Sequence, residues 1–364
     1  MAKAKEYFKC EECGYQSTNW MGRCSNCGSW NTMVKVKENE QETVEKVKTE
    51  DITPHAITKI ESGKRTRFQI GIEELDRVLG GGIVSGSLVL LGGAPGIGKS
   101  TLILQVASLF SHTYGKVLYV SGEESAPQIK LRAKRLGTLH DNLLVLAETE
   151  FNKIKGILND KNDYQLIIVD SIQTVFDSRL DSSPGSISQV KEVTNKLLKV
   201  AKTSEIPIFL IGHVTKKGEL AGPRVLEHLV DTVLQIEGDS NYIYRILRAI
   251  KNRFGSTNEI GVFEMGNSGL EEVKNPSQLF LRERDDKASG SVIVPTIEGS
   301  RTILVEVQAL VSAATFSTPQ RLTTGVDKKR VSILLAVLEK KAGFSFQDFD
   351  VHLNITGGLK VSEP

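Results

Sequence analysis

The chain has few aromatic residues, no long apolar run and almost no net charge. Aromatic residues make up 6% of its 364 residues, and only two of them are tryptophan. No apolar stretch approaches the roughly 20 residues that cross a bilayer, and residues 1–9 contain no apolar signal core. With 40% hydrophobic and 25% charged residues, the composition is that of a soluble globular protein. We therefore expect a cytoplasmic protein with no membrane partner.

A net charge of only +2 excludes bulk charge as evidence for nucleic-acid binding. Any DNA surface must come from local clusters, and each cluster is equally compatible with a solvated face. Because the chain has no base-reading motif, we expect contacts to the DNA backbone and to stacked bases. The basic clusters are Arg245, Arg248, Lys251 and Arg253, then Lys130, Arg132, Lys134 and Arg135, and finally Lys216 and Lys217.

Cysteine is absent after residue 27, and the four cysteines up to that position form two C-x-x-C pairs. This spacing predicts a tetrahedral zinc site. The alternative is a pair of disulfides in a secreted protein, against which the lack of a signal core argues. Four thiolates leave no open coordination position, so the zinc is expected to be structural. Its ligands are Cys10, Cys13, Cys24 and Cys27.

The most specific motif is a glycine-rich loop that matches the pattern G-x-x-x-x-G-K-[ST]. It follows a strand predicted over residues 87–91 and precedes a helix predicted over residues 101–112, which is the context that the pattern requires. Glycines let backbone N–H groups curl around a polyphosphate, and the helix N-terminus adds positive potential. The loop therefore predicts that ATP and Mg²⁺ are bound by Gly93, Ala94, Pro95, Gly96, Ile97, Gly98, Lys99, Ser100 and Thr101.

After this loop, short apolar strands alternate with helices, which favours an α/β fold with a mostly parallel sheet. Strands are predicted over residues 116–121, 143–146, 166–170 and 207–211, with helices over 128–136, 151–159 and 187–204. Three further strands, over residues 229–237, 242–250 and 259–264, are predicted as antiparallel extensions at the sheet edge. The pattern resets near residue 275, where a second domain with strands and one helix, residues 328–342, is expected.

Polar residues follow the predicted strands at the edge where ligands bind in open α/β sheets. Asp170 ends an apolar strand and is expected to hold Mg²⁺ through water, although a strand-ending Asp can also be a simple cap. Glu123 and Glu124 emerge at the same edge, and either could orient water against the γ-phosphate. His213 also lies there, either as a phosphate sensor or as a structural residue.

The Cys₄ module, the phosphate loop and the pentapeptide Lys251-Asn-Arg-Phe-Gly255 occur in this order. Over essentially the whole chain this order resembles the bacterial RadA (Sms) family of RecA-like DNA repair proteins. The pentapeptide is the most specific part because it is the family's signature. The resemblance implies a DNA-dependent ATPase acting in recombinational DNA repair, an activity that a DNA helicase would also have. It also implies a homohexameric ring that moves on single-stranded DNA and promotes branch migration of branched DNA, with a recombinase as a partner.

The resemblance also implies roles for single residues. Glu123 corresponds to the water-activating glutamate, and Asp170 to the second Mg²⁺ carboxylate. Lys251 and Arg253 are expected to reach the nucleotide of the neighbouring subunit. Residues 177–189 and 215–224 are expected to contact single-stranded DNA in the central hole of the ring.

Four regions follow from these patterns. Residues 1–34 are expected to form the zinc ribbon, 35–58 a charged linker, and 59–274 the RecA-like ATPase core. Residues 275–364 resemble the Lon protease domain that this family carries without peptidase function. Because the chain ends near where Lon proteins place the catalytic serine, this α+β domain is expected to be partial.

Two other functions remain open. A regulatory ATPase or kinase of the KaiC group shares the core, but that group lacks both the Cys₄ module and the pentapeptide. A non-enzymatic zinc-dependent adaptor with a vestigial nucleotide site is the other, against which intact Lys99, Ser100, Asp170 and Glu123 argue.

Overall fold

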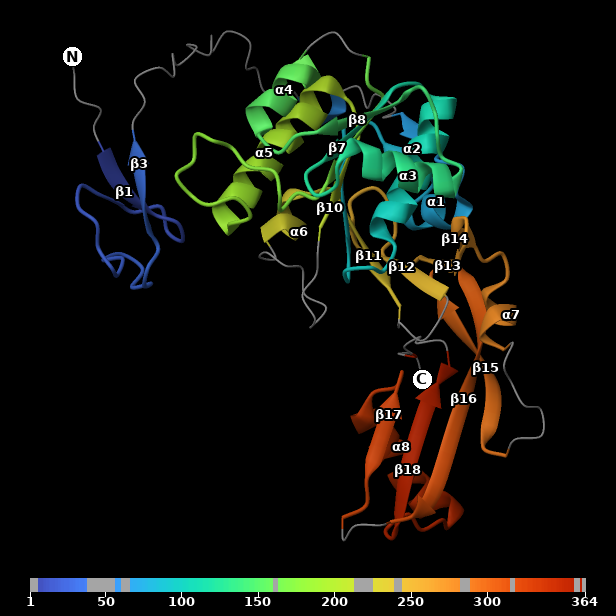
Figure 1. Cartoon of the computed structure of the whole chain (residues 1–364). Coiled ribbons are helices and arrows are strands. Elements are labelled where there is room, and N and C mark those ends of the chain that lie inside the picture. The colour runs from blue at the N-terminus through green and yellow to red at the C-terminus, as the bar shows by residue number, and fades with distance from the viewer. Residues whose placement is uncertain are drawn as a thin grey trace, which may run out of the picture. The chain divides into compact units, whose positions relative to one another are not determined.

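The structure is a computed structural model that describes residues 6–37, 56–59, 66–159, 163–212, 225–238, 244–281, 289–314, 318–356 and 361. The chain divides into two compact units, of which the first is Met1–Arg65 with Ser178–Ser183. The second comprises Thr66–Asp177 and Pro184–Pro364 and carries the large sheet of Figure 1. The two units are described separately below.

The N-terminal unit contains a three-stranded antiparallel sheet in the order β2-β1-β3. Its strands are β1 (Glu6–Cys10), β2 (Gln16–Ser17) and β3 (Met33–Lys37). Among the described residues of this unit, the buried apolar cluster consists of Cys10, Cys24 and Met33, with the partly buried Phe8 and Met21 packed against it. So small a core cannot offset the entropy of ordering the chain, and a metal would have to supply the missing free energy. A short 3-10 helix, η2 (Ile57–Lys59), is described further along.

The second unit is built on a nine-stranded sheet in the order β14-β13-β12-β11-β6-β10-β9-β7-β8. Six neighbouring strands, from β11 to β8, are mutually parallel. The central ones are buried on both faces, so their sequences are apolar without alternation. The parallel strands are β6 (Leu88–Gly93), β7 (Val117–Ser121), β8 (Leu143–Ala147), β9 (Leu166–Asp170), β10 (Ile208–Ile211) and β11 (Thr232–Glu237).

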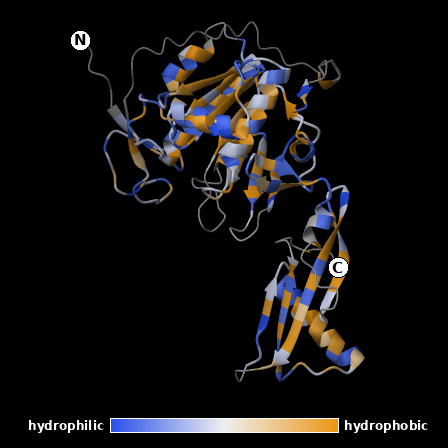
Figure 2. Ribbon diagram, turned by 45° about the vertical axis from the view of Figure 1, so that its right-hand side comes forward, coloured by the Kyte–Doolittle hydropathy of each residue, from blue (hydrophilic) through white to orange (hydrophobic). Residues whose placement is uncertain are grey.

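Helices cover both faces of this sheet, which confirms the predicted α/β class. Residues of α1 (Glu73–Leu79), α2 (Lys99–Thr113) and α3 (Ala126–Leu136) share one apolar cluster with the strands. Residues of α4 (Phe151–Asn159), α5 (Ile187–Ser204) and α6 (Val225–Leu229) share the cluster on the other face. Figure 2 shows the hydrophobic residues concentrated in the strands between these helices.

Three antiparallel strands extend the sheet beyond β11: β12 (Tyr244–Asn252), β13 (Ile260–Gly266) and β14 (Gly269–Glu272). The prediction that β11 itself is antiparallel was wrong. The unpredicted helix α6 precedes β11, so the chain enters β11 in the direction of β6 and pairs with it in parallel. The expectation that β12 is an edge strand was also wrong, because β13 and β14 lie outside it.

The C-terminal part begins with α7 (Pro276–Phe280) and forms a four-stranded sheet in the order β15-β16-β18-β17. β15 (Ser291–Glu298), β16 (Arg301–Ala313) and β18 (Phe349–Ile355) pair antiparallel, and β17 (Arg321–Thr324) pairs with β18 in parallel. The predicted helix is α8 (Lys328–Ala342). An apolar cluster joins β16 and β18 to β12 and β13 of the large sheet. Arg301 also forms a bidentate ion pair with buried Glu74 of α1, at 2.8 and 2.9 Å.

Candidate functional site

The phosphate loop lies between β6 and α2, at the carboxyl end of the parallel strands. Ala94, Pro95 and Gly96 are exposed, and Gly98 precedes the first turn of α2 with φ of 116°. This left-handed backbone conformation favours glycine, and a Cβ atom there would also displace the end of the Met265 side chain, 2.7 Å away. No described side chain caps the start of α2, which leaves its backbone N–H groups available for an anion.

Lys99 lies folded back onto the loop. Its Nζ donates to the carbonyl oxygens of Gly93 at 2.8 Å and Ala94 at 3.0 Å, and the residue is 5% exposed. Burial lowers the pKa of Lys99, while the charges of Asp170 and Glu123 act in the opposite direction. The ammonium group thus lies close to two carboxylates and within reach of a phosphate in the loop.

Asp170 ends β9 and is nearly buried, at 8% exposed. The hydroxyl of Tyr119 on β7 donates to Asp170 Oδ2 at 2.6 Å. Because β6 and β9 both pair with β10 in parallel, the carboxylate and the phosphate loop emerge at the same edge of the sheet. A hydroxyl from Ser100 and a carboxylate from Asp170 are oxygen donors of the kind that Mg²⁺ takes, so the residues fit this ion.

The two glutamates that follow β7 have different partners. Glu124 forms a close ion pair with Arg132 of α3, and its backbone N–H donates to Ser121 Oγ at 3.1 Å. Glu123 is exposed and accepts a hydrogen bond from the Ser171 hydroxyl, next to Asp170. The structure therefore brings Lys99, Asp170 and Glu123 together and holds Glu124 against α3.

The pentapeptide lies at the opposite end of the sheet. Lys251 pairs with Val233 of β11, whereas the phosphate loop follows Gly93, which pairs with Ile236. Val233 and Ile236 are three residues apart on β11, which at ~3.3 Å a residue separates Lys251 from Gly93 by about 10 Å along the strand direction. The phosphate loop continues beyond Gly93, away from Lys251. Within one chain, neither Lys251 nor Arg253 lies beside the phosphate loop.

Both cations have partners in their own chain. Lys251 Nζ donates to the carbonyl oxygens of Glu227 at 2.7 Å and Val230 at 2.8 Å. Burial lowers its pKa, and the neighbouring charge of Arg253 adds to that effect. The Arg253 side chain is 56% exposed and lies 3.3 Å from Oδ1 of buried Asp231.

The remaining residues of the pentapeptide form its support. Asn252 donates to the Val78 carbonyl oxygen at 3.3 Å and accepts from the Phe254 N–H at 2.9 Å. A Cβ atom on Gly255 would lie 3.0 Å from the Gly80 Cα, so the two backbones approach too closely for a side chain. Arg67 was not predicted as a site residue, yet its guanidinium joins the carbonyl oxygens of Gly80 and Phe254, at 2.7 and 2.9 Å.

The four cysteine sulfurs of the N-terminal unit lie within 4.8 Å of one another. Two of the sulfur pairs, Cys10 with Cys27 and Cys13 with Cys24, are 3.6 Å apart. A tetrahedral ion with bonds of ~2.3 Å places its sulfurs about 3.8 Å apart, so this arrangement fits zinc. A hydrogen bond with Thr32 lowers the pKa of Cys10 to about 6, which favours the thiolate that a metal requires.

Other predicted residues lie elsewhere. His213, Lys216, Lys217 and the segment 215–224 fall outside the described residues. Of the basic clusters, Arg245 Nε donates to the Ile97 carbonyl oxygen in the phosphate loop at 3.2 Å, and Arg248 forms ion pairs with Glu237 and Glu298. None of the described helices is long and apolar enough to cross a membrane.

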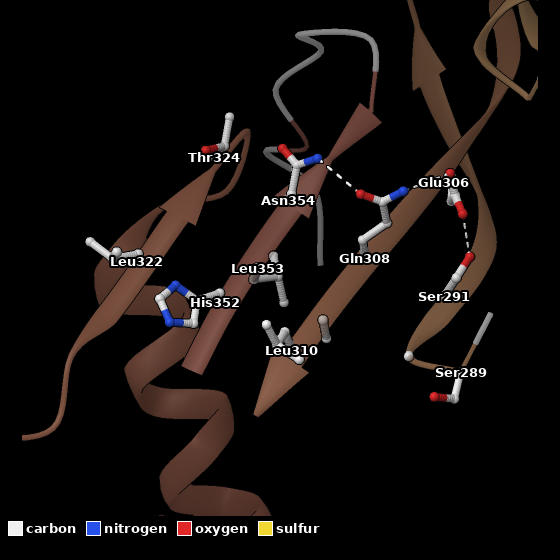
Figure 3. Close-up of a pocket in the computed structure, with 12 residues that line it drawn as sticks. Ser289, Ser291, Glu306, Gln308, Leu310, Leu322, Thr324, His352, Leu353 and Asn354 are labelled. Atoms are coloured by element: carbon white, nitrogen blue, oxygen red, sulfur yellow. Dashed lines mark hydrogen bonds between the residues drawn. The ribbon is translucent and has the colours of Figure 1, made fainter. Parts of the chain in front are cut away.

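A separate hollow lies on the C-terminal sheet, and Figure 3 shows the residues that line it. Its polar side chains hydrogen-bond to one another, as Asn354 does to Gln308 at 3.2 Å and Ser291 does to Glu306. None of the predicted site residues lines it. The phosphate loop therefore remains the candidate site.

Two family models match the chain, one described as an AAA domain over residues 60–219 and one as a rubredoxin metal binding domain over residues 8–35. The DNA repair protein RadA of Bacillus subtilis (strain 168) is 52% identical over 376 residues. The RadA of Halalkalibacterium halodurans is 51% identical over 368 residues. Both alignments cover 100% of this chain and 80% of the relative.

Two solved structures each cover 57% of this chain. A RadB recombinase is 23% identical with a TM-score of 0.45, and the KaiC-like protein PH0186 from Pyrococcus horikoshii OT3 is 21% identical with a TM-score of 0.48. Neither TM-score is high enough to carry an argument. The identity of more than half over the full chain is decisive: the chain belongs to the RadA family of DNA repair proteins, and the AAA domain match over residues 60–219 supports an ATPase core.

Proposed function

We propose that this protein is a DNA-stimulated ATP hydrolase that acts in recombinational DNA repair as a hexameric ring on single-stranded or branched DNA. The observation that carries the proposal is the convergence of Lys99, Asp170 and Glu123 at the end of the sheet where α2 presents uncapped N–H groups. The names of the relatives, DNA repair protein RadA, support the repair role. A protein that acts on bacterial DNA works in the cytoplasm.

In this mechanism the loop from Gly93 to Thr101 holds the phosphates of ATP. Backbone N–H groups at the start of α2 receive the phosphate oxygens. Lys99 exchanges its two carbonyl partners for the β- and γ-phosphates, which is favourable because a charged acceptor makes a stronger hydrogen bond than a carbonyl. Mg²⁺, when bound, neutralises phosphate charge, and Ser100 and Asp170 would hold it.

Glu123 orients the attacking water and takes its proton. Glu123 accepts a hydrogen bond from the Ser171 hydroxyl beside Asp170 and lies near Lys99 at the reacting edge. Glu124 instead lies against α3, in an ion pair with Arg132. The position of Glu123 beside the phosphate loop favours it as the general base.

Lys251 and Arg253 act on the nucleotide of the neighbouring subunit. They lie at the far end of the sheet from the phosphate loop of their own chain. This distance disfavours a contact between these cations and the nucleotide bound in the same chain. A cation from another copy stabilises the charge that develops on the γ-phosphate, as an arginine finger does. This role requires a ring, and DNA in its centre would control how the subunits close on each other.

Zinc in the Cys₄ site would order the first unit, with Cys10, Cys13, Cys24 and Cys27 as ligands. A recombinase is the proposed protein partner. The adaptor alternative requires an inert nucleotide site, and the intact set of Lys99, Ser100, Asp170 and Glu123 disfavours it.

The deciding experiment is the rate of ATP hydrolysis with and without single-stranded DNA. We expect slow turnover alone and a clear increase with DNA, with Lys99→Ala as the inactive control. ATP hydrolysis that does not respond to any DNA would favour the regulatory ATPase, and no hydrolysis at all would favour the adaptor.

A further inference from the structure

A buried tyrosine contacts the carboxylate proposed to hold Mg²⁺. Tyr119 lies on β7 and Asp170 on the adjacent parallel strand β9, where Ser121 pairs with Asp170 and Tyr119 pairs with Ile168. The Tyr119 side chain therefore extends two residues towards the carboxyl end of the sheet. Its hydroxyl reaches Asp170 Oδ2 at 2.6 Å, and the residues are only 1% and 8% exposed.

This contact limits the orientations that the carboxylate can take. The short hydrogen bond from the fixed phenol restrains rotation of the Asp170 carboxylate about its Cβ–Cγ bond. Oδ2 then accepts one hydrogen bond from the phenol, and Oδ1 has both of its lone pairs directed elsewhere. The charge of Asp170 also acts on Lys99, so a freely rotating carboxylate could turn towards that ammonium group.

The phenol is a fixed donor to Asp170 Oδ2. The ring packs in the apolar cluster beneath the site, among residues of the sheet and α2, which fixes the hydroxyl in place. The sequence gives no sign of this, because a tyrosine in an apolar strand is an ordinary core residue.

We propose that Tyr119 is a positioning residue for the metal: its hydroxyl holds the Asp170 carboxylate so that Oδ1 is presented to the hydration shell of nucleotide-bound Mg²⁺. This inference rests on the proposed function, because it assumes that nucleotide binds at the phosphate loop. It assigns to Tyr119 no contact with substrate. Its effect is confined to the part of nucleotide affinity that depends on Mg²⁺.

The test is the affinity of a fluorescent ADP analogue for the full chain, measured in Mg²⁺ and again in EDTA. The ratio of the two affinities is the Mg²⁺ contribution. Tyr119→Phe keeps the ring and removes only the hydroxyl, so the affinity in EDTA should stay unchanged. The Mg²⁺ contribution should fall by ~10-fold, the scale of a hydrogen bond to a charged group.

The matched control is Tyr114→Phe. Tyr114 is a tyrosine of the same unit whose hydroxyl donates to the Gln69 carbonyl oxygen at 2.9 Å, away from Asp170. We expect this variant to keep the full Mg²⁺ contribution. A double-mutant cycle adds a second readout: in an Asp170→Ala background, Tyr119→Phe should change the ratio no further.

Each outcome is informative. An unchanged ratio in Tyr119→Phe, or a fall of equal size in Mg²⁺ and in EDTA, overturns the inference and leaves Tyr119 as a core residue. If Tyr119→Phe is too unstable to assay, the cycle is measured with Tyr119→Met instead, which needs no extra volume and has no donor, and a ratio equal to that of the parent chain overturns the inference. If Lys99→Ala binds the analogue as tightly as the parent chain, the proposed nucleotide site itself is wrong, whatever Tyr119 does.

Discussion

The two ends of the large sheet carry lysines that make the same contact in different surroundings. Lys99 and Lys251 each donate to two main-chain carbonyl oxygens at 2.7 to 3.0 Å. Two carboxylates act on each lysine, Asp170 and Glu123 on Lys99, and Asp231 and Glu227 on Lys251. The difference is that Lys99 lies beside the open start of α2, whereas Lys251 lies beside another cation, Arg253. A lysine beside a phosphate-binding loop, as Lys99 is, can bind the phosphates of a nucleotide held by its own chain. In the proposed mechanism, the pair of cations at the other end of the sheet acts on the nucleotide of another copy.

The largest expected effect concerns the cationic end. Arg253→Ala removes the exposed guanidinium and should reduce DNA-stimulated hydrolysis by ~10³-fold, while ATP binding to the same chain persists. Hydrolysis rate and nucleotide affinity are measured on the same sample. Lys251→Ala should act in the same direction, with an added loss of stability because α6 loses the ammonium group that bonds its terminal carbonyl oxygens.

A mixing experiment tests whether this effect acts between subunits. Lys251→Ala chains mixed with Lys99→Ala chains should regain some activity, because a few composite sites then contain both intact parts. Full activity of Lys251→Ala alone, or no recovery in verified mixed rings, would contradict the action of Lys251 in trans.

The next effect concerns the base at the phosphate end. Glu123→Gln should spare ATP binding and slow turnover by ~10²-fold or more, since it removes a positioned base. Glu124→Gln is the matched control, and we expect a small effect because this residue is paired with Arg132. The reverse pattern would assign the role to Glu124.

Lys99→Ala should weaken nucleotide affinity by ~30-fold, which corresponds to about 2 kcal/mol for a charge-assisted hydrogen bond. The affinity of ADP measured by calorimetry checks this expectation. The far end of the sheet should not respond, so the lowered affinity should occur without a lowered melting temperature. A large loss of stability would mean that Lys99 has a structural role like that of Lys251.

A smaller effect is expected for Arg67→Ala. This residue bonds four carbonyl oxygens, those of Leu79, Gly80, Gly82 and Phe254, so its loss should destabilise the unit by about 1–3 kcal/mol. DNA-stimulated hydrolysis should fall by ~5-fold, because the support of Arg253 loosens. Thermal melting and hydrolysis rates check both values, with Arg67→Lys as a variant that keeps the charge without the fork.

The smallest effect on the sheet is expected from the zinc site. Cys10→Ser should release about one zinc per chain, as measured by metal analysis, and expose the first 30 or so residues to protease. Hydrolysis without DNA should change by less than ~2-fold, because the Cys₄ cluster and the phosphate loop belong to different compact units. Metal-free reduced protein, or intact disulfides, would contradict the zinc assignment.

Much of the fold follows from local sequence. α5 begins and ends at the predicted residues, and its start is marked by the capping hydroxyl of Ser186. Strand order does not follow, because pairing joins segments far apart in the chain. The parallel direction of β11 depends on α6, whose five residues are too short to give a periodic pattern.

The candidate site divides in the same way. Lys99 and Asp170 could be predicted because a loop pattern and a strand end fix their places in any such fold. Tyr119 and Arg67 could not be predicted, since each is an ordinary residue whose partners are set only by tertiary packing. Sequence motifs therefore predict the residues that bind ligands, but they do not predict the residues that hold those side chains in position.

Both tryptophans of the chain, Trp20 and Trp30, lie in the Cys₄ unit, where they are 59% and 71% exposed, and Arg23 lies 5.8 Å from the Trp30 ring. Intrinsic tryptophan emission from this protein therefore comes from the zinc unit alone. A change in emission on adding a chelator, DNA or a partner protein reports an event at that unit, without any label. Tryptophan emission that stays constant during ATP turnover would show that hydrolysis at the large sheet leaves the surroundings of Trp20 and Trp30 unchanged.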